Sequence, residues 1–234
     1  MQKLIYSYNP SHKMGIDLIL QNTELMTILY AFFIAFICAI LVLKIDRMFK
    51  ISDYQGLRYI RNAFFFYSLS FIILFVLGRG EVNASLIYTK VIWFLFKFLI
   101  TTAVLFLLYS LIWKKVEKNK SHNSLFNLKS ATIYLIALVL SITGTHIFYP
   151  SQIILNIAIL SFSLKNLINE KNKYPFLKYY SIAICASLLH WTTSYLIELG
   201  LLNAHTAILS IFGNLAFFLI FLGGILNITR NKNG

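Results

Sequence analysis

Lys97 is the residue whose type and position most strongly suggest chemistry, because it lies inside the apolar run Val91–Ile100. A charged side chain at the centre of a membrane-spanning helix costs about 2.5–3.5 kcal/mol, so such residues usually mark function and face the helix bundle. Lys97 lies about 11 residues, or ~16 Å, from the outer end of its expected helix. The lysine stem is too short to reach the outer interface over that distance, which favours a buried amine that needs a partner.

Other polar residues of the expected helices fall at the depth of Lys97, a few residues to the outer side of each helix centre. Steps of three and four residues place Thr101 on the face of Lys97 and Thr193 on the face of His190. Convergence at one depth is what a binding site in a bundle core requires. The predicted ligand-binding residues are Lys97, His190, Asn156, Asn214, Ser141, Thr101 and Thr193. The alternative is that each of them pairs separately with a neighbouring helix.

Carboxylates are missing from the expected depth of Lys97. All eight fall near the membrane surfaces: Asp17, Glu24, Glu81 and Glu198 on the outer side, and Asp46, Asp53, Glu117 and Glu170 on the cytoplasmic side. A buried ammonium without a counter-ion either loses its proton or holds an anion from outside the chain. Two expectations follow: a neutral Lys97 that has lost its proton on burial, or a small anionic or polar ligand bound near Lys97.

The elements that must position these residues are membrane-spanning helices. Of the 234 residues, 59% are hydrophobic and 12% are charged, whereas soluble domains carry roughly 25% charged residues. This composition excludes a cytosolic enzyme, a disordered protein and a secreted disulfide scaffold. Seven stretches have about the apolar length that crosses ~30 Å of hydrocarbon. We expect an all-α, polytopic, single seven-helix transmembrane domain over residues 1–234, with spans at about 24–43, 58–77, 86–113, 130–149, 151–167, 178–198 and 206–228.

Pro150 separates the fourth and fifth expected helices. Proline is favoured at the first position of a helix, so we expect the fifth helix to begin there. No proline then lies inside a span, and the helices are expected to be continuous. Because secondary transporters often interrupt their helices near the substrate, this favours a compact bundle over a rocking carrier.

Lysine and arginine are distributed unevenly between the two sides of the expected bundle. Sixteen of the 21 basic residues fall on one side: Lys44, Arg47, Lys50, Arg58, Arg61, Lys114, Lys115, Lys118, Lys120, Lys129, Lys165, Lys171, Lys173, Lys178, Arg230 and Lys232. This bias predicts an N-terminus outside and a C-terminus in the cytoplasm of a multi-pass cell-membrane protein. Contact with anionic lipid headgroups at the cytoplasmic face, worth about 1 kcal/mol per basic residue, explains the net charge of +13 without nucleic acid.

Catalytic signatures are not found in the sequence. There is no Ser-His-Asp set, paired carboxylates, HExxH or glycine-rich phosphate loop, and the two cysteines, Cys38 and Cys185, lie singly in apolar runs without metal-ligand spacing. We therefore expect neither an enzyme nor a bound cofactor or metal. The topology is similar to that of microbial rhodopsins, but the expected seventh span holds no lysine that could carry retinal. We assign no family.

These observations favour a receptor-like or sensory membrane protein that binds a small anionic or polar ligand in an outward-facing pocket. Such a protein would need a protein partner for its output. Two alternatives stay open: a small transporter or channel for an anion or polar solute, and an accessory subunit of a larger membrane complex. A receptor binds without flux, a transporter moves solute, and a subunit co-purifies with other chains.

Overall fold

The chain is entirely helical in the parts described by its computed structural model, which are residues 13–52, 55–77, 86–116, 128–169, 176–202 and 206–231. Within these ranges there are seven α-helices: α1 (Lys13–Ser52), α2 (Gln55–Leu77), α3 (Leu86–Val116), α4 (Leu128–Ile142), α5 (Thr145–Asn169), α6 (Phe176–Glu198) and α7 (Ala207–Asn231). Side chains are described within residues 29–50, 55–74, 87–112, 130–168, 176–202, 206 and 208–227. The all-α class expected from the composition is confirmed.

Four of the helices are long and apolar enough to cross a membrane. The qualifying segments are Leu29–Lys50 in α1, Ile87–Ile112 in α3, Thr145–Ile168 in α5 and Ile208–Asn227 in α7. By contrast, α4 has 15 residues, which corresponds to about 22 Å of helix, less than the ~30 Å of a hydrocarbon core. The structure therefore supports a membrane protein with four candidate spans.

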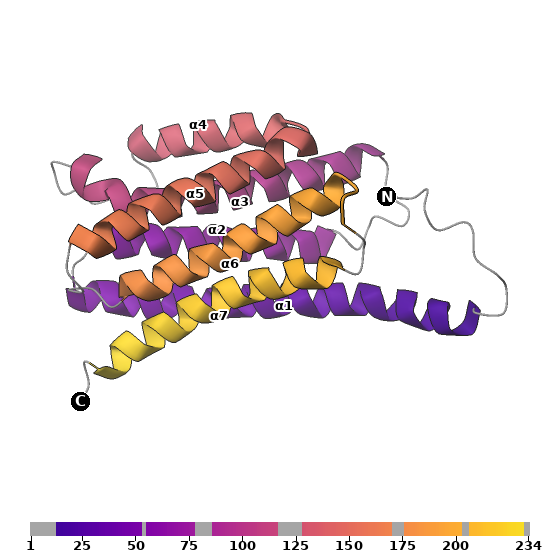
Figure 1. Cartoon of the computed structure of the whole chain (residues 1–234), viewed down its shortest axis with the longest axis horizontal. Coiled ribbons are helices and arrows are strands. Elements are labelled where there is room, and N and C mark those ends of the chain that lie inside the picture. Colours follow the sequence, from indigo (N-terminus) through magenta and orange to yellow (C-terminus); the bar gives the residue numbers. More distant parts are fainter. Residues whose placement is uncertain are drawn as a thin grey trace.

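Six helices form a closed ring, and α4 lies outside it. Each helix contacts the next in the order α1, α2, α3, α5, α6, α7, and α7 closes the ring by contacting α1. Helix α4 packs against α3 and α5, and its Tyr134 ring also lies 6.0 Å from that of Phe66 in α2. Figure 1 shows the helices running roughly along one axis, with α4 at the edge of the bundle and α1 extending beyond the other helices.

Aromatic side chains fill the centre of the ring. Phe64 of α2 is fully buried, and its ring lies 4.9 Å from that of Phe221 in α7. Tyr180 of α6 stacks edge-on against Phe221 at 5.1 Å and donates a hydrogen bond of 2.8 Å from its hydroxyl to the carbonyl of Leu107 in α3. Aromatic pairs of this geometry contribute about 0.5–1.5 kcal/mol beyond their buried area. These contacts link α2, α7, α6 and α3 across the middle of the ring.

The boundary between α4 and α5 differs from the expectation. Helix α4 ends at Ile142 and α5 begins at Thr145, so Pro150 lies inside α5, not at its first position. The expected limits of 130–149 and 151–167 are wrong here, because the chain breaks at Thr143–Gly144. The Thr143 hydroxyl donates to the carbonyl of Leu140 at 2.6 Å, and the Gly144 carbonyl accepts from the amides of the new helix. Glycine lowers helix stability by about 1 kcal/mol relative to alanine, and α5 continues through Pro150 although proline removes one main-chain donor there.

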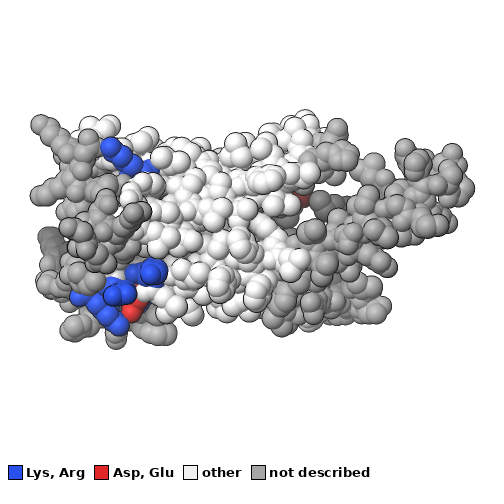
Figure 2. Space-filling view, turned by 90° about the horizontal axis from the view of Figure 1, so that it is seen from below, with Lys and Arg blue, Asp and Glu red and all other residues white. Residues whose placement is uncertain are grey.

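Charged residues gather at one end of the bundle, which we call the basic end and which contains Lys44, Arg47, Lys50, Arg58 and Arg61. On the face seen in Figure 2, a wide band without described charges separates this end from the other.

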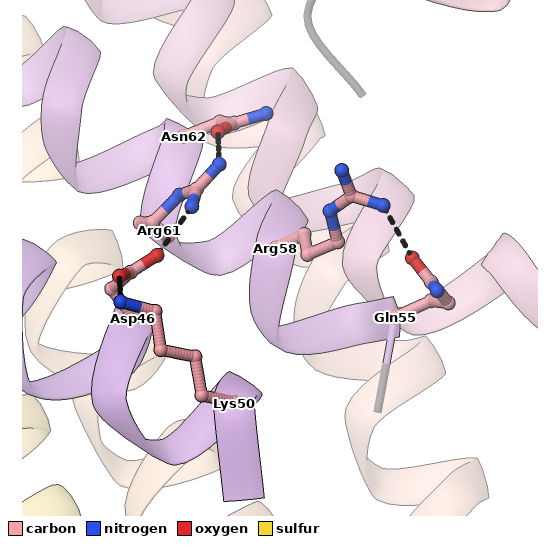
Figure 3. A network of polar contacts seen from close by, with 6 residues as sticks. All are labelled: Asp46, Lys50, Gln55, Arg58, Arg61 and Asn62. Carbon is pink, nitrogen blue, oxygen red and sulfur yellow. Dashed lines mark hydrogen bonds and ion pairs between the residues drawn. The ribbon is translucent and has the colours of Figure 1, made fainter. Parts of the chain in front are cut away.

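Ion pairs join α1 and α2 at the basic end. Asp46 of α1 lies 3.3 Å from Lys50 and pairs with Arg61 of α2, while Arg58 donates to Gln55 at 3.1 Å (Figure 3). These groups are partly exposed, so the pairs orient the helix ends more than they stabilise them.

Candidate functional site

Lys97 of α3 contacts the turn between α4 and α5. Its Nζ donates a hydrogen bond of 3.2 Å to the carbonyl of Thr143 and lies 5.3 Å from the centre of the Phe148 ring. The carbonyl belongs to the residue that follows the last turn of α4, where a helix carries a partial negative charge and unpaired carbonyls. The lysine thus caps a neighbouring helix. Among the described side chains, no carboxylate lies within ion-pairing distance of it.

The position of this turn explains how the amine is accommodated. Figure 1 shows that α3 continues past the α4–α5 turn, so the outer ends of these helices are not level. The depth expected for Lys97 was counted along α3 alone, as if the neighbouring helices ended level with α3. Because α4 ends early, a polar main-chain group meets Lys97 at its own level. We call the end of the bundle that carries this turn the expected outer end.

Glu198 contacts the same turn from α6. Thr145 donates a hydrogen bond of 2.9 Å from its hydroxyl to Glu198 Oε1, and Glu198 lies near enough to Lys97 for a Coulombic interaction. The carboxylate belongs to the last residue of α6, which ends because Gly200 adopts a left-handed conformation with φ of 72°. The Gly200 amide bonds the Ile197 carbonyl at 3.0 Å, a helix-ending arrangement that suits glycine.

A second polar group lies between α3 and α5, one turn along from Lys97. Gln152 donates from Nε2 to the hydroxyl oxygen of Thr101 at 2.9 Å, and Asn156 donates to the main-chain carbonyl of Gln152 at 2.8 Å. All three residues are buried. Gln152 Oε1 has no hydrogen-bond partner among the described groups. A buried unpaired oxygen costs about 1–3 kcal/mol, so this interface is not optimised for stability alone.

His190 belongs to a separate group between α6 and α7. Its Nδ1 lies 2.8 Å from the hydroxyl oxygen and 2.9 Å from the carbonyl oxygen of Ser210. Ser194, one turn further along α6, shares a hydrogen bond of 2.8 Å with the Ser210 hydroxyl. The imidazole ring packs against the neighbouring Trp191, with 5.0 Å between ring centres. This group is hydrogen-bonded within itself.

The remaining predicted residues have local or structural partners. Asn214 of α7 donates a hydrogen bond of 2.6 Å to the hydroxyl of Tyr30 in α1. Ser141 and Thr193 donate to carbonyls of their own helices, at 2.8 Å and 2.7 Å respectively. Such bonds are common uses of asparagine, serine and threonine in membrane helices.

The structure therefore connects some of the predicted site residues and separates others. Lys97, Thr101 and Asn156 follow one another along the α3–α5 interface. His190 is linked to that column through two aromatic side chains, since Trp191 lies 5.8 Å from Phe148, the residue beneath Lys97. Direct contacts between Lys97 and His190 are not seen in the described structure.

Sequence reasoning missed several polar partners. Gln152 lies four residues before Asn156 and Ser210 four before Asn214, so helical spacing was the available signal for both. Thr143, which binds Lys97 through its carbonyl, carries no such signal because any residue supplies a carbonyl. Glu198 was placed at the outer rim, but its proximity to Lys97 depends on where α4 ends.

Comparison with known proteins yields no relative. No family model matches the chain, and neither a curated protein nor a solved structure matches it. Among the described residues, no cluster of three His, Cys, Asp or Glu side chains has a metal-binding arrangement.

Proposed function

We propose that this chain is a receptor-like or sensory membrane protein that binds a small anionic or polar ligand at the expected outer end of its bundle. The observation that carries the proposal is the environment of Lys97. Its ammonium group meets a carbonyl and an aromatic ring but, within the described residues, no carboxylate. An ammonium has three N–H donors, and the described part of the protein occupies one of them here. The other donors and the positive charge suit an incoming anion.

The proposal includes the membrane arrangement expected from the sequence. In it, all seven helices span the cell membrane as one domain over residues 1–234, with the N-terminus outside and the C-terminus in the cytoplasm. The charges of the basic end support this orientation, because basic residues collect at the cytoplasmic side. In that setting anionic headgroups contact the basic end, and a partner protein receives the output there.

The aromatic centre of the ring favours binding over an open channel. Phe64, Phe221 and Tyr180 are fully buried and fill the space between the helices. A ligand held near Lys97 therefore has no described polar route through the ring. We expect binding without flux.

The first test is ligand binding by the whole protein in lipid nanodiscs. Acetate, chloride and phosphate serve as probes, and heat is measured by titration calorimetry. We expect at least one probe to bind, and Lys97→Met to weaken its affinity about tenfold or more, because the methionine cannot donate to an anion. Lys90→Met, which removes an exposed lysine from the same helix, should bind like the unmodified protein.

The proposal fails if no probe binds, or if the two variants bind equally well. Both variants are first compared by size exclusion and circular dichroism, so that a folding defect is not mistaken for lost binding. Proteoliposomes loaded with the bound probe then measure flux.

A transporter is the second candidate, and Pro150 is the observation that favours it. Proline inside α5 removes one main-chain hydrogen bond next to the buried Gln152, and transporters interrupt helices near their sites. Lys97-dependent flux in proteoliposomes would support the transporter over the receptor. An accessory subunit would instead co-purify with other chains.

A further inference from the structure

Two opposite charges are anchored on either side of Gly144. Lys97 binds the carbonyl of Thr143, and Glu198 accepts from the hydroxyl of Thr145, so the two contacts are two residues apart in one turn. The charges interact through space but do not form an ion pair. Each is held by a neutral group of the turn instead of by the other.

Both charged groups keep hydrogen-bonding capacity. The Lys97 ammonium uses one of its three donors on Thr143, and Glu198 uses Oε1 on Thr145. A carboxylate accepts up to about four hydrogen bonds, so most of its acceptor sites are available. Within the described residues, the ammonium therefore keeps two donors and the carboxylate about three acceptor sites at the same turn.

The surroundings of the turn are open and partly aromatic. Gly144 is exposed, and a Cβ added there would meet nothing within 4 Å. Glu198 is exposed as well, whereas Phe148 lies buried beneath Lys97 and packs against Trp191. A small ligand can therefore reach the two charged groups from the expected outer end, while the buried Phe148 ring lies beneath the ammonium.

We infer that Lys97 and Glu198 together recognise a small zwitterion, a molecule with a carboxylate for the lysine and an ammonium group for the glutamate. This inference rests on the proposed function and narrows its ligand class. It also assigns a binding role to Glu198, which was not among the ligand-binding residues expected from the sequence. A zwitterion neutralises both charges at once, which neither a simple anion nor a simple amine does.

The test compares ligands that differ only by the ammonium group. Glycine, β-alanine, 4-aminobutyrate and 5-aminopentanoate are titrated into the whole protein in nanodiscs, alongside acetate, propionate, butyrate and pentanoate. Because the series varies the spacing between the charges, it also measures the separation that the site prefers. We expect that, at one chain length, the amino acid binds about tenfold tighter than its amine-free counterpart.

Glu198→Gln should abolish this preference and leave the affinity for the amine-free carboxylate unchanged. Lys97→Met should weaken both members of each pair. Asp46→Asn removes a carboxylate from the basic end, and we expect it to retain the preference. Glu198→Asp keeps the charge on a shorter stem, so it should shift the preferred chain length and show that the variant site is folded.

Two results would overturn the inference. One is equal binding of both members at every chain length; the other is a preference that survives in Glu198→Gln. If the carboxylates still bind in a Lys97-dependent manner in either case, the zwitterion is wrong while the anion-binding proposal stands. If no member of either series binds the unmodified protein, the zwitterion is wrong; if chloride and phosphate also fail to bind, the anion-binding proposal is wrong as well.

Discussion

The α6–α7 and α3–α5 interfaces both carry buried polar side chains, but they differ in how completely these are paired. Between α6 and α7, His190 and Ser194 both bond Ser210, and two glycines of α7 bring the helices close together. Between α3 and α5, the side-chain oxygen Oε1 of Gln152 has no hydrogen-bond partner among the described groups. Small residues and satisfied hydrogen bonds are what stable helix pairs in membranes use. The contrast indicates that α6–α7 supports the bundle, whereas α3–α5 accepts a cost next to the candidate site.

The largest expected effect on the free energy of unfolding comes from Gly224, where α7 lies closest to Tyr179 of α6. A Cβ at position 224 would lie 2.6 Å from the Cβ of Tyr179, closer than two side chains can approach. We expect Gly224→Ala to lower the free energy of unfolding by about 2 kcal/mol, since overpacking costs about 1–3 kcal/mol. Denaturant unfolding in mixed micelles, followed by tryptophan fluorescence, measures the change.

Gly223→Ala is the matched control, because a Cβ at that position meets nothing within 4 Å. This substitution should be neutral or stabilise the helix by up to about 1 kcal/mol, since alanine favours helix over glycine. Equal destabilisation by the two alanines would contradict the close α6–α7 contact.

The next largest effect is expected for the hydroxyl that joins the α6–α7 group. Ser210→Ala removes the partner of both His190 and Ser194, and we expect the unfolding free energy to fall by about 1 kcal/mol. Ser161→Ala is the comparison in the same assay: its hydroxyl is exposed and bonds its own helix at 2.9 Å. If both serines cost the same, pairing across the interface adds nothing.

The smallest effect is expected at the unpaired carboxamide of α3–α5. Gln152→Leu removes the unpaired oxygen, and the Thr101 hydroxyl can turn to its own helix, as Thr102 does toward Phe98 at 2.8 Å. We expect the unfolding free energy to change by less than about 0.5 kcal/mol, or to rise, because an apolar replacement avoids an unsatisfied group. A loss as large as that of Ser210→Ala would erase the distinction between the two interfaces.

Sequence reasoning was most successful where the signal lay in composition and local spacing. Long apolar runs predicted the helices, and single residues such as Lys97, Thr101 and Asn156 were picked out because polar side chains are rare within such runs. The α4–α5 boundary was wrong because Pro150 and Gly144 both signal a break six residues apart. Helix α5 runs through Pro150, its sixth residue, and the chain turns at Thr143–Gly144 instead.

Partners were harder to predict than sites. Depth along separate helices placed Lys97 and His190 together, yet rotation about the helix axes turns His190 toward α7 and Lys97 toward the α4–α5 turn. The depth of a residue along its own helix does not tell which neighbouring helix its side chain contacts. Glu198 shows the same effect, since its approach to Lys97 follows from the early end of α4.

By itself, the amino-acid sequence determined that this chain is helical and that it carries a lysine where hydrocarbon is expected. Those properties follow from local apolar length and from the cost of a charge, which depend on no other part of the chain. Tertiary structure decided that α4 lies outside a ring of six helices and that a main-chain carbonyl of its final turn meets the lysine. The physical reason is that hydrogen bonds require donor and acceptor within about 3 Å, so the order in which helices pack selects the partners.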